Sequence, residues 1–272
     1  MVPLSSTPSA AWPSDEGWPN TLDPRTICLT VDVEWAAGEV LDDLRSLFDE
    51  RRLTATFFCT HPGVEVGSHE RGIHPNFRIS GETVKQLRAV KGELVLLDDV
   101  AVFRHVLGRT LSFAPEAKGV RSHSLHYDSL LLPLYSELGL EYDSTYFIPL
   151  VSGLRPFWKE YDVLELPIYF NDHFELKTAA TGFDFRSLTI DKPGLKVINV
   201  HPNMVFLNAA SNEQYLATKP FYHDVERLRA ARHMGFGIRT MFIDLLDAIA
   251  KDRYPTATLG VVNARWRSLR TI

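Results

Sequence analysis

Two acidic side chains, Asp32 and Glu34, lie one residue apart at the end of the first strongly apolar run, which begins at Thr26. In a β-strand, residues i and i+2 point to the same face, so both carboxylates would project together from the tip of a buried strand. Two adjacent buried carboxylates are costly unless a cation or a proton lies between them. The pair therefore predicts a metal site at a strand end, where α/β folds place their functional residues. A helix-capping pair at a strand–helix turn is the structural alternative.

The rest of the chain alternates short apolar runs with segments of helical period, which is typical of α/β folds. With 272 residues and 45% hydrophobic content, the chain is long enough for one large domain. We predict about seven strands, in a parallel barrel or an open doubly wound sheet. The predicted strands are residues 26–34, 53–60, 64–67 or 72–74, 119–122, 142–147, 163–169 and 195–200. The predicted helices are residues 38–52, 81–90, 94–107 and 129–138, with two more within 221–251.

Residues 1–23 differ from the rest in being rich in proline, serine and tryptophan. They have neither a basic start nor an apolar stretch, so we expect no secretory signal. We interpret them as a flexible lead, or as a strap that lays Trp12 and Trp18 on the surface. Residues 24–272 are then expected to form a single domain.

Composition excludes several classes of partner. The net charge is −5 and no basic block stands out, so nucleic acid is not expected as a partner. The longest apolar runs stop short of the ~18 residues that span a bilayer. Cys28 and Cys59 both lie in apolar, strand-like runs, which predicts two buried thiols in a reducing compartment. We therefore expect a cytoplasmic protein without a membrane span.

Polar clusters recur at the carboxyl ends of the predicted strands. In a barrel, these ends converge on one mouth, so clusters that are distant in sequence would share one site. Five such clusters, which contain five of the ten histidines, favour a common functional site. The clusters are Asp32 with Glu34, His61, His69 with His74, Arg121 with His123, and His201.

The order of these motifs resembles the NodB-type polysaccharide deacetylase superfamily from residue 26 to about residue 204. Thr-Val-Asp-Val-Glu at 30–34 occupies the place of that family's T-F-D-D-G motif, and Ala-Thr-Phe-Phe at 55–58 is similar to the strand that follows it. Further similar segments are Glu-Val-Gly-Ser-His at 65–69, Gly-Ile-His-Pro at 72–75, Val-Arg-Ser-His at 120–123, Tyr-Asp-Ser-Thr at 142–145 and Val-His-Pro at 200–202. The strings at 72–77 and 154–158 are similar to members encoded with O-antigen assembly genes.

The resemblance implies a distorted (β/α)7 barrel that binds a divalent metal, commonly zinc. Carried over by position, Asp32 is the general base and His201 is the general acid. Glu34 is the acidic metal ligand, and Arg121 orients Asp32 through a charge-assisted hydrogen bond. Asp172 is expected to pair with Arg121 from the other side. Iron, cobalt or nickel would also suit one carboxylate with two histidines.

The histidine spacing departs from the family pattern. The family's two metal-binding histidines are four residues apart, whereas His69 and His74 are five apart. Residues five apart do not share a helical face, so this pair cannot bind one ion from a helix. The stretch from His61 to Glu65 is also too short for the helix that usually separates the second and third strands, so we expect that helix to be missing. We expect His74 to be a ligand because Pro75 follows it; the candidates for the third ligand are His69, His123, His61 and Asn76.

These expectations lead to a functional hypothesis. The resemblance implies metal-dependent hydrolysis of an acetyl group from an acetylated sugar, a precursor in surface-polysaccharide (O-antigen) synthesis. His123, Asn76 and Tyr127 are expected to contact that carbohydrate. The alternatives are an inactive barrel that binds a glycan or a protein, and an amidohydrolase that acts on a small non-sugar amide.

Overall fold

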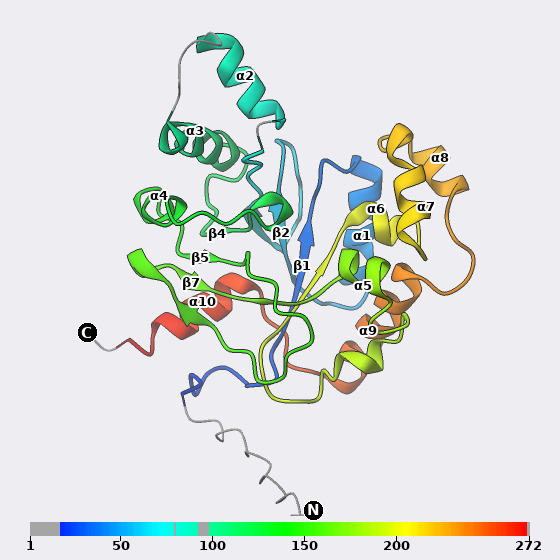
Figure 1. The fold of residues 1–272 in the computed structure, drawn as a ribbon. Coiled ribbons are helices and arrows are strands. Elements are labelled where there is room, and N and C mark those ends of the chain that lie inside the picture. Colours follow the sequence, from blue (N-terminus) through cyan, green and yellow to red (C-terminus); the bar gives the residue numbers. More distant parts are fainter. Residues whose placement is uncertain (1–16, 79, 92–97, 271–272) are drawn as a thin grey trace, which may run out of the picture.

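The computed structural model describes residues 17–78, 80–91 and 98–270, which form a curled sheet with helices packed around its outside (Figure 1). The strand order is β6-β7-β5-β4-β3-β2-β1-β9-β8. All neighbouring strands are parallel except β6 and β7, which are antiparallel. The strands are β1 (Ile27–Asp32), β2 (Ala55–Cys59), β3 (Glu70–Ile73), β4 (Gly119–Val120), β5 (Tyr142–Asp143), β6 (Phe157–Trp158), β7 (Leu164–Glu165), β8 (Ile168–Asn171) and β9 (Lys196–Val200). The predicted α/β class is confirmed.

The two edges of the sheet approach each other through the segment that follows β5. The Ile148 N–H donates to the Ile168 carbonyl at 2.9 Å, and the Ile168 N–H donates to the Tyr146 carbonyl at 2.8 Å. These bonds attach residues 146–150 to β8. The sheet therefore curls almost to closure, as expected of a distorted barrel.

Proline explains why one predicted strand became two. The run 163–169 was expected to form a single strand, but Pro167 separates β7 from β8. Proline has no N–H for the hydrogen-bonded ladder, so pairing stops there. β7 pairs with β5, and the chain then crosses to pair β8 with β9. The third strand lies at the later of its two predicted positions, and residues 60–69 contain turns but no helix.

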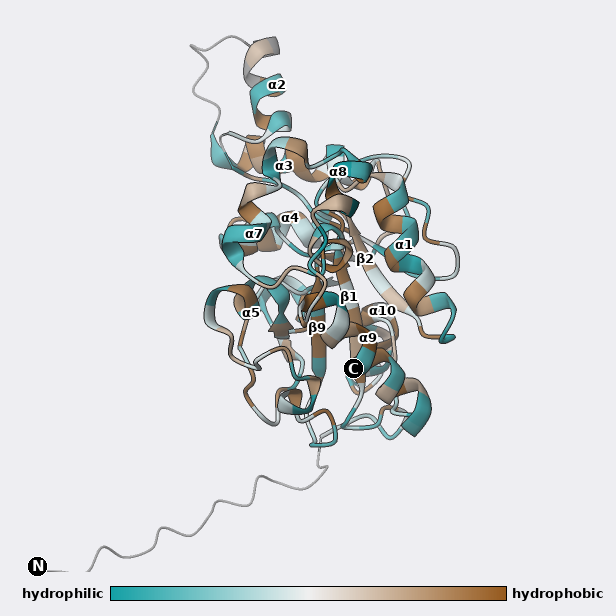
Figure 2. Cartoon of the chain, turned by 90° about the vertical axis from the view of Figure 1, so that its right-hand side faces the viewer, coloured by the Kyte–Doolittle hydropathy of each residue, from teal (hydrophilic) through white to brown (hydrophobic). Residues whose placement is uncertain are grey.

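The helices follow the predicted apolar periodicity where that periodicity is strong. In α1, Val40, Leu44, Leu47 and Phe48 are buried, which is the spacing of one helical face. Figure 2 shows apolar residues concentrated on the central strands and on the helix faces that cover them. The longer helices are α1 (Gly38–Asp49), α2 (Glu82–Lys91), α3 (Asp99–Leu111), α9 (Ile238–Asp252) and α10 (Leu259–Arg267). The shorter ones are α4 (Leu131–Glu137), α5 (Asp172–Thr178), α6 (Pro202–Phe206), α7 (Asn212–Ala217), α8 (Val225–Ala230) and the 3-10 turns η1 (His123–Leu125), η2 (Glu160–Asp162), η3 (Phe185–Leu188) and η4 (Lys219–Phe221).

The amino-terminal segment reaches the domain at its described end. Trp18 is buried, and its ring packs edge-on against that of Trp266 in α10, with 5.3 Å between the centroids. Trp12, with the rest of residues 1–16, lies outside the described residues. Cys28 and Cys59 are both buried and unpaired, as predicted. Within the described ranges, no helix is long and apolar enough to cross a membrane.

A buried ion cluster fastens the β6–β7 hairpin to β5. Lys159 Nζ lies 2.7 Å from Asp143 Oδ2 and also contacts Glu165, and all three side chains are at most 5% exposed. Burial, together with the charge of Asp143, raises the pKa of Glu165 to about 8. At neutral pH Glu165 therefore holds a proton for most of the time, and Lys159 is the cation that contacts both acids inside the barrel wall.

Replacing Lys159 with methionine is expected to lower the free energy of unfolding by about 3–5 kcal/mol, because the buried Asp143–Glu165 pair would lose its counter-ion. Chemical denaturation monitored by circular dichroism measures this loss. Lys118→Met is the matched control, since Lys118 pairs with Glu141 at the surface at 3.5 Å. That control should cost less than about 1 kcal/mol. Equal losses in the two variants would contradict the assigned role.

Candidate active site

The polar strand ends meet at one end of the barrel, toward which β1 runs in Figure 1. Asp32 is the last residue of β1, His74 follows β3, and Arg121 follows β4. Asp172 follows β8, and His201 follows β9. Parallel strands bring these five residues together although 169 positions separate Asp32 from His201 in the sequence.

Glu34, His74 and His123 form a cluster with the composition of a metal site. One ligand atom from each residue lies within 4.8 Å of the other two. Glu34 Oε1 is 3.1 Å from His74 Nε2 and 2.7 Å from His123 Nδ1. Burial raises the pKa of Glu34, but the two imidazoles outweigh it and hold that pKa well below its usual value. One carboxylate and two imidazoles are ligands that zinc accepts in proteins.

The backbone after β1 determines where Glu34 points. β1 ends at Asp32, and Glu34 and Trp35 both have left-handed backbone angles, with φ of 50° and 55°. Strand alternation therefore does not orient Glu34, contrary to the reasoning from the i, i+2 spacing. The turn is held by Tyr222, whose hydroxyl donates to the Glu34 carbonyl at 3.0 Å, and by the Trp35 N–H, which donates to Thr60 Oγ1 at 3.0 Å. Such positive φ values in non-glycine residues are uncommon and often occur at functional sites.

A backbone contact fixes the tautomer of His74. Its Nδ1 lies 2.7 Å from the carbonyl oxygen of Arg121, which can only accept a hydrogen bond. Nδ1 therefore carries a proton, and Nε2 is the ring nitrogen directed at Glu34. Metal-binding histidines are typically oriented by this kind of hydrogen bond on the other ring nitrogen. The geometry of His74 thus fits a metal ligand.

Asp32 is held beside this cluster by a buried guanidinium. Arg121 Nη1 lies 3.0 Å from Asp32 Oδ1, and Asn199 Nδ2 donates to Asp32 Oδ2 at 2.9 Å. Burial raises the pKa of Asp32, but the charge of Arg121 and smaller contributions from His74, His201 and the Asn199 hydrogen bond together outweigh it, so the pKa is lowered. Asp32 is thus a fixed, ionised carboxylate at the barrel mouth.

Arg121 is itself fully buried and held from several sides. Its Nε donates to the Ser144 carbonyl at 2.8 Å, and its Nη2 donates to Ser144 Oγ at 2.7 Å. Asp172 does not pair with Arg121, which corrects the expectation from the sequence. The reason is that β8 lies beyond β9 from β1, so the end of β8 faces His201 instead.

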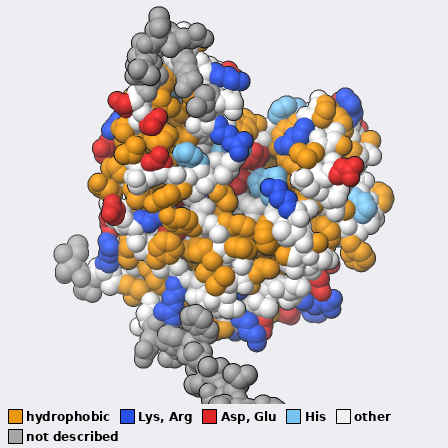
Figure 3. Space-filling view, in the orientation of Figure 1, with side chains coloured by type: hydrophobic (Ala, Val, Ile, Leu, Met, Phe, Trp, Pro, Cys, Tyr) orange, Lys and Arg blue, Asp and Glu red, His pale blue; other side chains and the backbone are white. Residues whose placement is uncertain are grey.

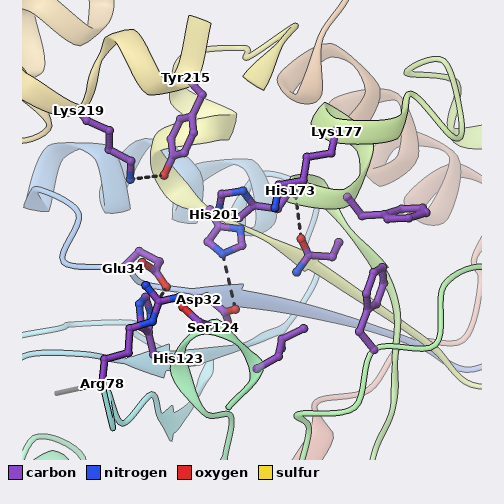
Figure 4. A pocket seen from close by; sticks show the side chains of 14 residues that line it. Asp32, Glu34, Arg78, His123, Ser124, His173, Lys177, His201, Tyr215 and Lys219 are labelled. Atoms are coloured by element: carbon purple, nitrogen blue, oxygen red, sulfur yellow. Dashed lines mark hydrogen bonds and ion pairs between the residues drawn. The ribbon is translucent and has the colours of Figure 1, made fainter. Parts of the chain in front are cut away.

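His201 and Asp172 form a second charged pair. Asp172 Oδ1 lies 2.5 Å from the ring atom Nδ1 of His201, and Asp172 Oδ2 accepts the backbone N–H of His201 at 2.6 Å. Burial lowers the pKa of His201, but Asp172 more than compensates and raises it to about 9. The Nε2 atom of His201 points toward Asp32, 3.7 Å from Oδ2 (Figure 4). A protonated imidazole therefore faces an ionised carboxylate.

The His201–Asp172 pair predicts a pH-dependent stability in metal-free protein. The pKa of about 9 in the folded protein exceeds the usual histidine value of 6.5, so protonation of His201 stabilises the fold. This contribution is complete below pH 6.5 and disappears as the pH rises through 9; its upper limit is about 3 kcal/mol. Urea unfolding between pH 6 and 10 should show this decline in the wild type and a flatter profile in Asp172→Asn. His105→Gln, which removes an exposed imidazole, should keep the wild-type slope. Parallel slopes in wild type and Asp172→Asn would refute the coupling.

An open cavity of about 540 Å³ lies above these groups. Figure 3 shows a hollow near the centre of this face, with acidic, basic and histidine side chains gathered around it. Its volume lies in the usual range of small-molecule sites. The lining residues are Asp32, Glu34, Arg78, His123, Ser124, Leu125, Phe147, Asn171, His173, Phe174, Lys177, His201, Tyr215 and Lys219.

The structure separates His69 from the other candidate ligands. Its Nδ1 accepts the N–H of Ala55, at the start of β2, and its Nε2 lies 3.2 Å from Asp49 Oδ1. The His74 N–H instead donates to the carbonyl of Cys59, at the end of β2. His69 and His74 therefore lie at opposite ends of one strand, which corrects the expectation that His69 is a ligand.

Three other predicted residues lie outside the ligand cluster. His61 Nδ1 lies 3.0 Å from the hydroxyl of the preceding Thr60, and Asn76 Oδ1 accepts the N–H of Arg78. Tyr127 is exposed, and its ring lies tilted against that of Tyr146, with 5.1 Å between the centroids. Neither Asn76 nor Tyr127 is among the described residues that line the cavity. Of the predicted carbohydrate contacts, only His123 lines it, and His123 also belongs to the metal-type cluster.

Sequence reasoning missed several groups that hold the site. Asn199 binds Asp32 and also accepts from Arg121 Nη1 at 2.6 Å. Asn199 and His201 are an i, i+2 pair at the end of a strand, so the argument used for the first strand could have identified Asn199. His173, whose pKa is lowered to about 4 by burial and by His201, had no comparable signal.

Comparison with known proteins shows the family of the chain. A family model described as WbmS-like polysaccharide deacetylase matches residues 29–219, which is more than half of the chain. The chain is 26% identical to a candidate polysaccharide deacetylase involved in O-antigen biosynthesis from Bordetella bronchiseptica. That match covers 81% of this chain and 89% of the other, with a TM-score of 0.65.

A second solved structure shares the fold at lower identity. It is a candidate polysaccharide deacetylase from Mycobacterium smegmatis, 15% identical, with a TM-score of 0.54 and coverage of 99% of this chain and 97% of the other. No curated protein matched the chain. The matched family model covers the strand ends that carry Asp32, His74, Arg121 and His201. The chain therefore belongs to the WbmS-like family of polysaccharide deacetylases.

Proposed function

We propose that this protein hydrolyses an acetyl group from an N-acetylated or O-acetylated sugar, using a divalent metal ion bound by Glu34, His74 and His123. The observation that carries the proposal is the arrangement around one cavity. A metal-type cluster, an ionised carboxylate and a protonated imidazole all border the same space. Metal-assisted hydrolysis of an amide or ester uses these three functions together.

The three candidate ligands fit a divalent ion by their chemistry. The Nδ1 proton of His74 is committed to the Arg121 carbonyl, so in the neutral ring Nε2 is the nitrogen that can bind an ion. His123 is brought beside it by its own N–H, which donates to the Pro75 carbonyl at 2.9 Å. When bound, zinc, iron, cobalt or nickel would polarise the acetyl carbonyl and acidify the attacking water.

Asp32 is proposed as the general base. It is ionised and faces the cavity, and Arg121 and Asn199 fix both of its oxygens. In this role it takes a proton from the attacking water as the new carbon–oxygen bond forms. Arg121 is the positioning residue for this carboxylate, because it contacts Asp32 and does not line the cavity.

His201 is proposed as the general acid. It is protonated at neutral pH because Asp172 raises its pKa to about 9, and its Nε2 faces the cavity. In this role it donates a proton to the leaving nitrogen or oxygen of the sugar as the bond to the acetyl carbon breaks. Asp172 keeps the ring oriented through Nδ1.

Two observations support an acetylated carbohydrate as the substrate. The family is one of polysaccharide deacetylases, and the Bordetella relative is described as involved in O-antigen biosynthesis. We extend this to the chain by proposing a precursor of a surface polysaccharide. The cavity is wide enough for a sugar ring, and Phe147, Phe174 and Tyr215 give it apolar walls.

Acetate release from a panel of N-acetylated and O-acetylated sugars tests the proposal. The protein is first stripped with a chelator and then supplied with one equivalent of zinc, iron, cobalt or nickel. We expect acetate from at least one sugar, none after stripping, and recovery with metal. If no sugar yields acetate in any metal form while calorimetry detects sugar binding, the protein is a binding protein and the proposal is wrong.

A further inference from the structure

Three cationic side chains from separate segments line the mouth of the cavity. Arg78 lies after β3, Lys177 lies in the last turn of α5, and Lys219 begins η4. In the view of Figure 4, Lys177 and Lys219 lie on one side of the acidic floor formed by Asp32 and Glu34, and Arg78 lies on the other. A group bound at the mouth would thus meet positive charge from two directions.

None of these cations has a carboxylate partner among the described residues. The acids on the cavity floor are already committed, Asp32 to Arg121 and Glu34 to two histidines. Several exposed arginines elsewhere pair with acids, among them Arg104 with Glu137, Arg186 with Asp184, and Arg229 with Glu226. What sets Arg78, Lys177 and Lys219 apart is that three separate segments bring them to one cavity, which points to a ligand as their partner.

Lys219 is also held in place, unlike a free surface lysine. Its Nζ donates to the Tyr215 hydroxyl at 2.7 Å and lies 4.4 Å from the ring centroids of both Tyr215 and Tyr222. Tyr222 in turn donates to the carbonyl of Glu34. The ammonium group is therefore fixed relative to the candidate metal ligands and needs little ordering when it binds an anion.

We propose that the acetylated substrate carries an anionic group, a carboxylate on the sugar or a phosphate attached to it, which Lys177, Lys219 and Arg78 bind while the acetyl group occupies the cavity floor. This inference rests on the proposed deacetylation and specifies its substrate class. A guanidinium can bind either anion through two parallel hydrogen bonds, and the two ammonium groups add charge without that geometric demand. Neutral acetylated sugars would make none of these contacts.

Calorimetry with three probes on metal-loaded protein tests the inference. The probes are the methyl glycoside of N-acetylglucosamine, N-acetylglucosaminuronic acid and N-acetylglucosamine 1-phosphate. At least one anionic probe should bind about tenfold or more tightly than the neutral glycoside, since hydrogen bonds to charged groups are the stronger ones. The anionic probe that binds more tightly identifies the source of the charge as the sugar carboxylate or the phosphate.

Variants assign the effect to the cavity mouth. Lys219→Gln and Lys177→Gln should each remove most of the preference for the anionic probe over the neutral glycoside, while Lys219→Arg should retain that preference. Lys251→Gln is the matched control, because Lys251 is exposed in the last turn of α9, near the amino ends of the strands. Equal affinity for all three probes, no binding of either anion, or an unchanged preference in both glutamine variants would overturn the inference.

Acetate release from the same probes separates this inference from the proposed function. Efficient release from the neutral glycoside, unaffected by Lys219→Gln and Lys177→Gln, would refute the anionic substrate and leave deacetylation intact. Lysine-dependent binding of an anionic probe without acetate release from any probe would support the anion site and count against deacetylation.

Discussion

Replacing His123 with alanine is expected to abolish stable metal binding, whereas replacing His69 with alanine should leave about one ion per chain. His123 Nδ1 contacts Glu34 in the ligand cluster, while His69 lies at the opposite end of β2. Losing an outer-shell partner alone weakens metal affinity by about 10–100-fold, so losing a direct ligand should exceed that. Inductively coupled plasma mass spectrometry after dialysis measures the metal content, and acetate release should fall with it.

The paired variants make this result decisive. Both histidines are at least partly buried, so circular dichroism must first show that each variant is folded. Glu34→Ala and His74→Ala should behave like His123→Ala because they remove the other two members of the cluster. Retention of metal in His123→Ala, or loss of metal in folded His69→Ala, would exclude the proposed ligand set.

Changing Asp32 to asparagine should reduce acetate release by about 10²–10⁴-fold, because the amide keeps the shape of the side chain but cannot accept the proton of the attacking water. The metal content should not change, since Asp32 is not a member of the ligand cluster. Initial rates and metal analysis on the same preparation test both statements. Asp42→Asn, an exposed carboxylate on α1, is the control and should have wild-type rates.

The outcome distinguishes a base from a structural acid. Arg121 would lose its buried counter-ion in Asp32→Asn, so some loss of stability is expected even if the variant folds. A folded, metal-loaded Asp32→Asn protein with wild-type rates would eliminate Asp32 as the base. Loss of the metal together with the activity would place Asp32 among the ligands instead.

Much of the site followed from local patterns in the sequence. Apolar runs that end in polar residues identified Asp32, His74, Arg121 and His201 as strand-end residues, and the structure places all four at the same end of the barrel. The prediction succeeded because burial of a parallel strand is encoded locally, in a short run of apolar and β-branched residues. The same logic, applied to β9, would have added Asn199.

Other features depended on contacts that local patterns do not specify. Asp172 was expected to pair with Arg121, but the strand order puts β8 next to β9, and Asp172 binds His201. Whether His69 or His123 lies beside Glu34 depends on which end of the sheet each residue occupies. His69 lies at the amino end of β2, and His123 follows the carboxyl end of β4. Histidine spacing alone could not answer that question, because β3 begins only after His69.

The sequence by itself determined the fold class, the family resemblance and the strand ends that carry the chemistry, since each depends on the order of residues within short segments. Only the tertiary structure decided which acid pairs with which basic side chain and which histidine completes the metal cluster. It also showed that three cations without a carboxylate partner among the described residues line one cavity. These are distances between residues far apart in the chain, and they are set by strand order, by the curl of the sheet and by the left-handed turn at Glu34.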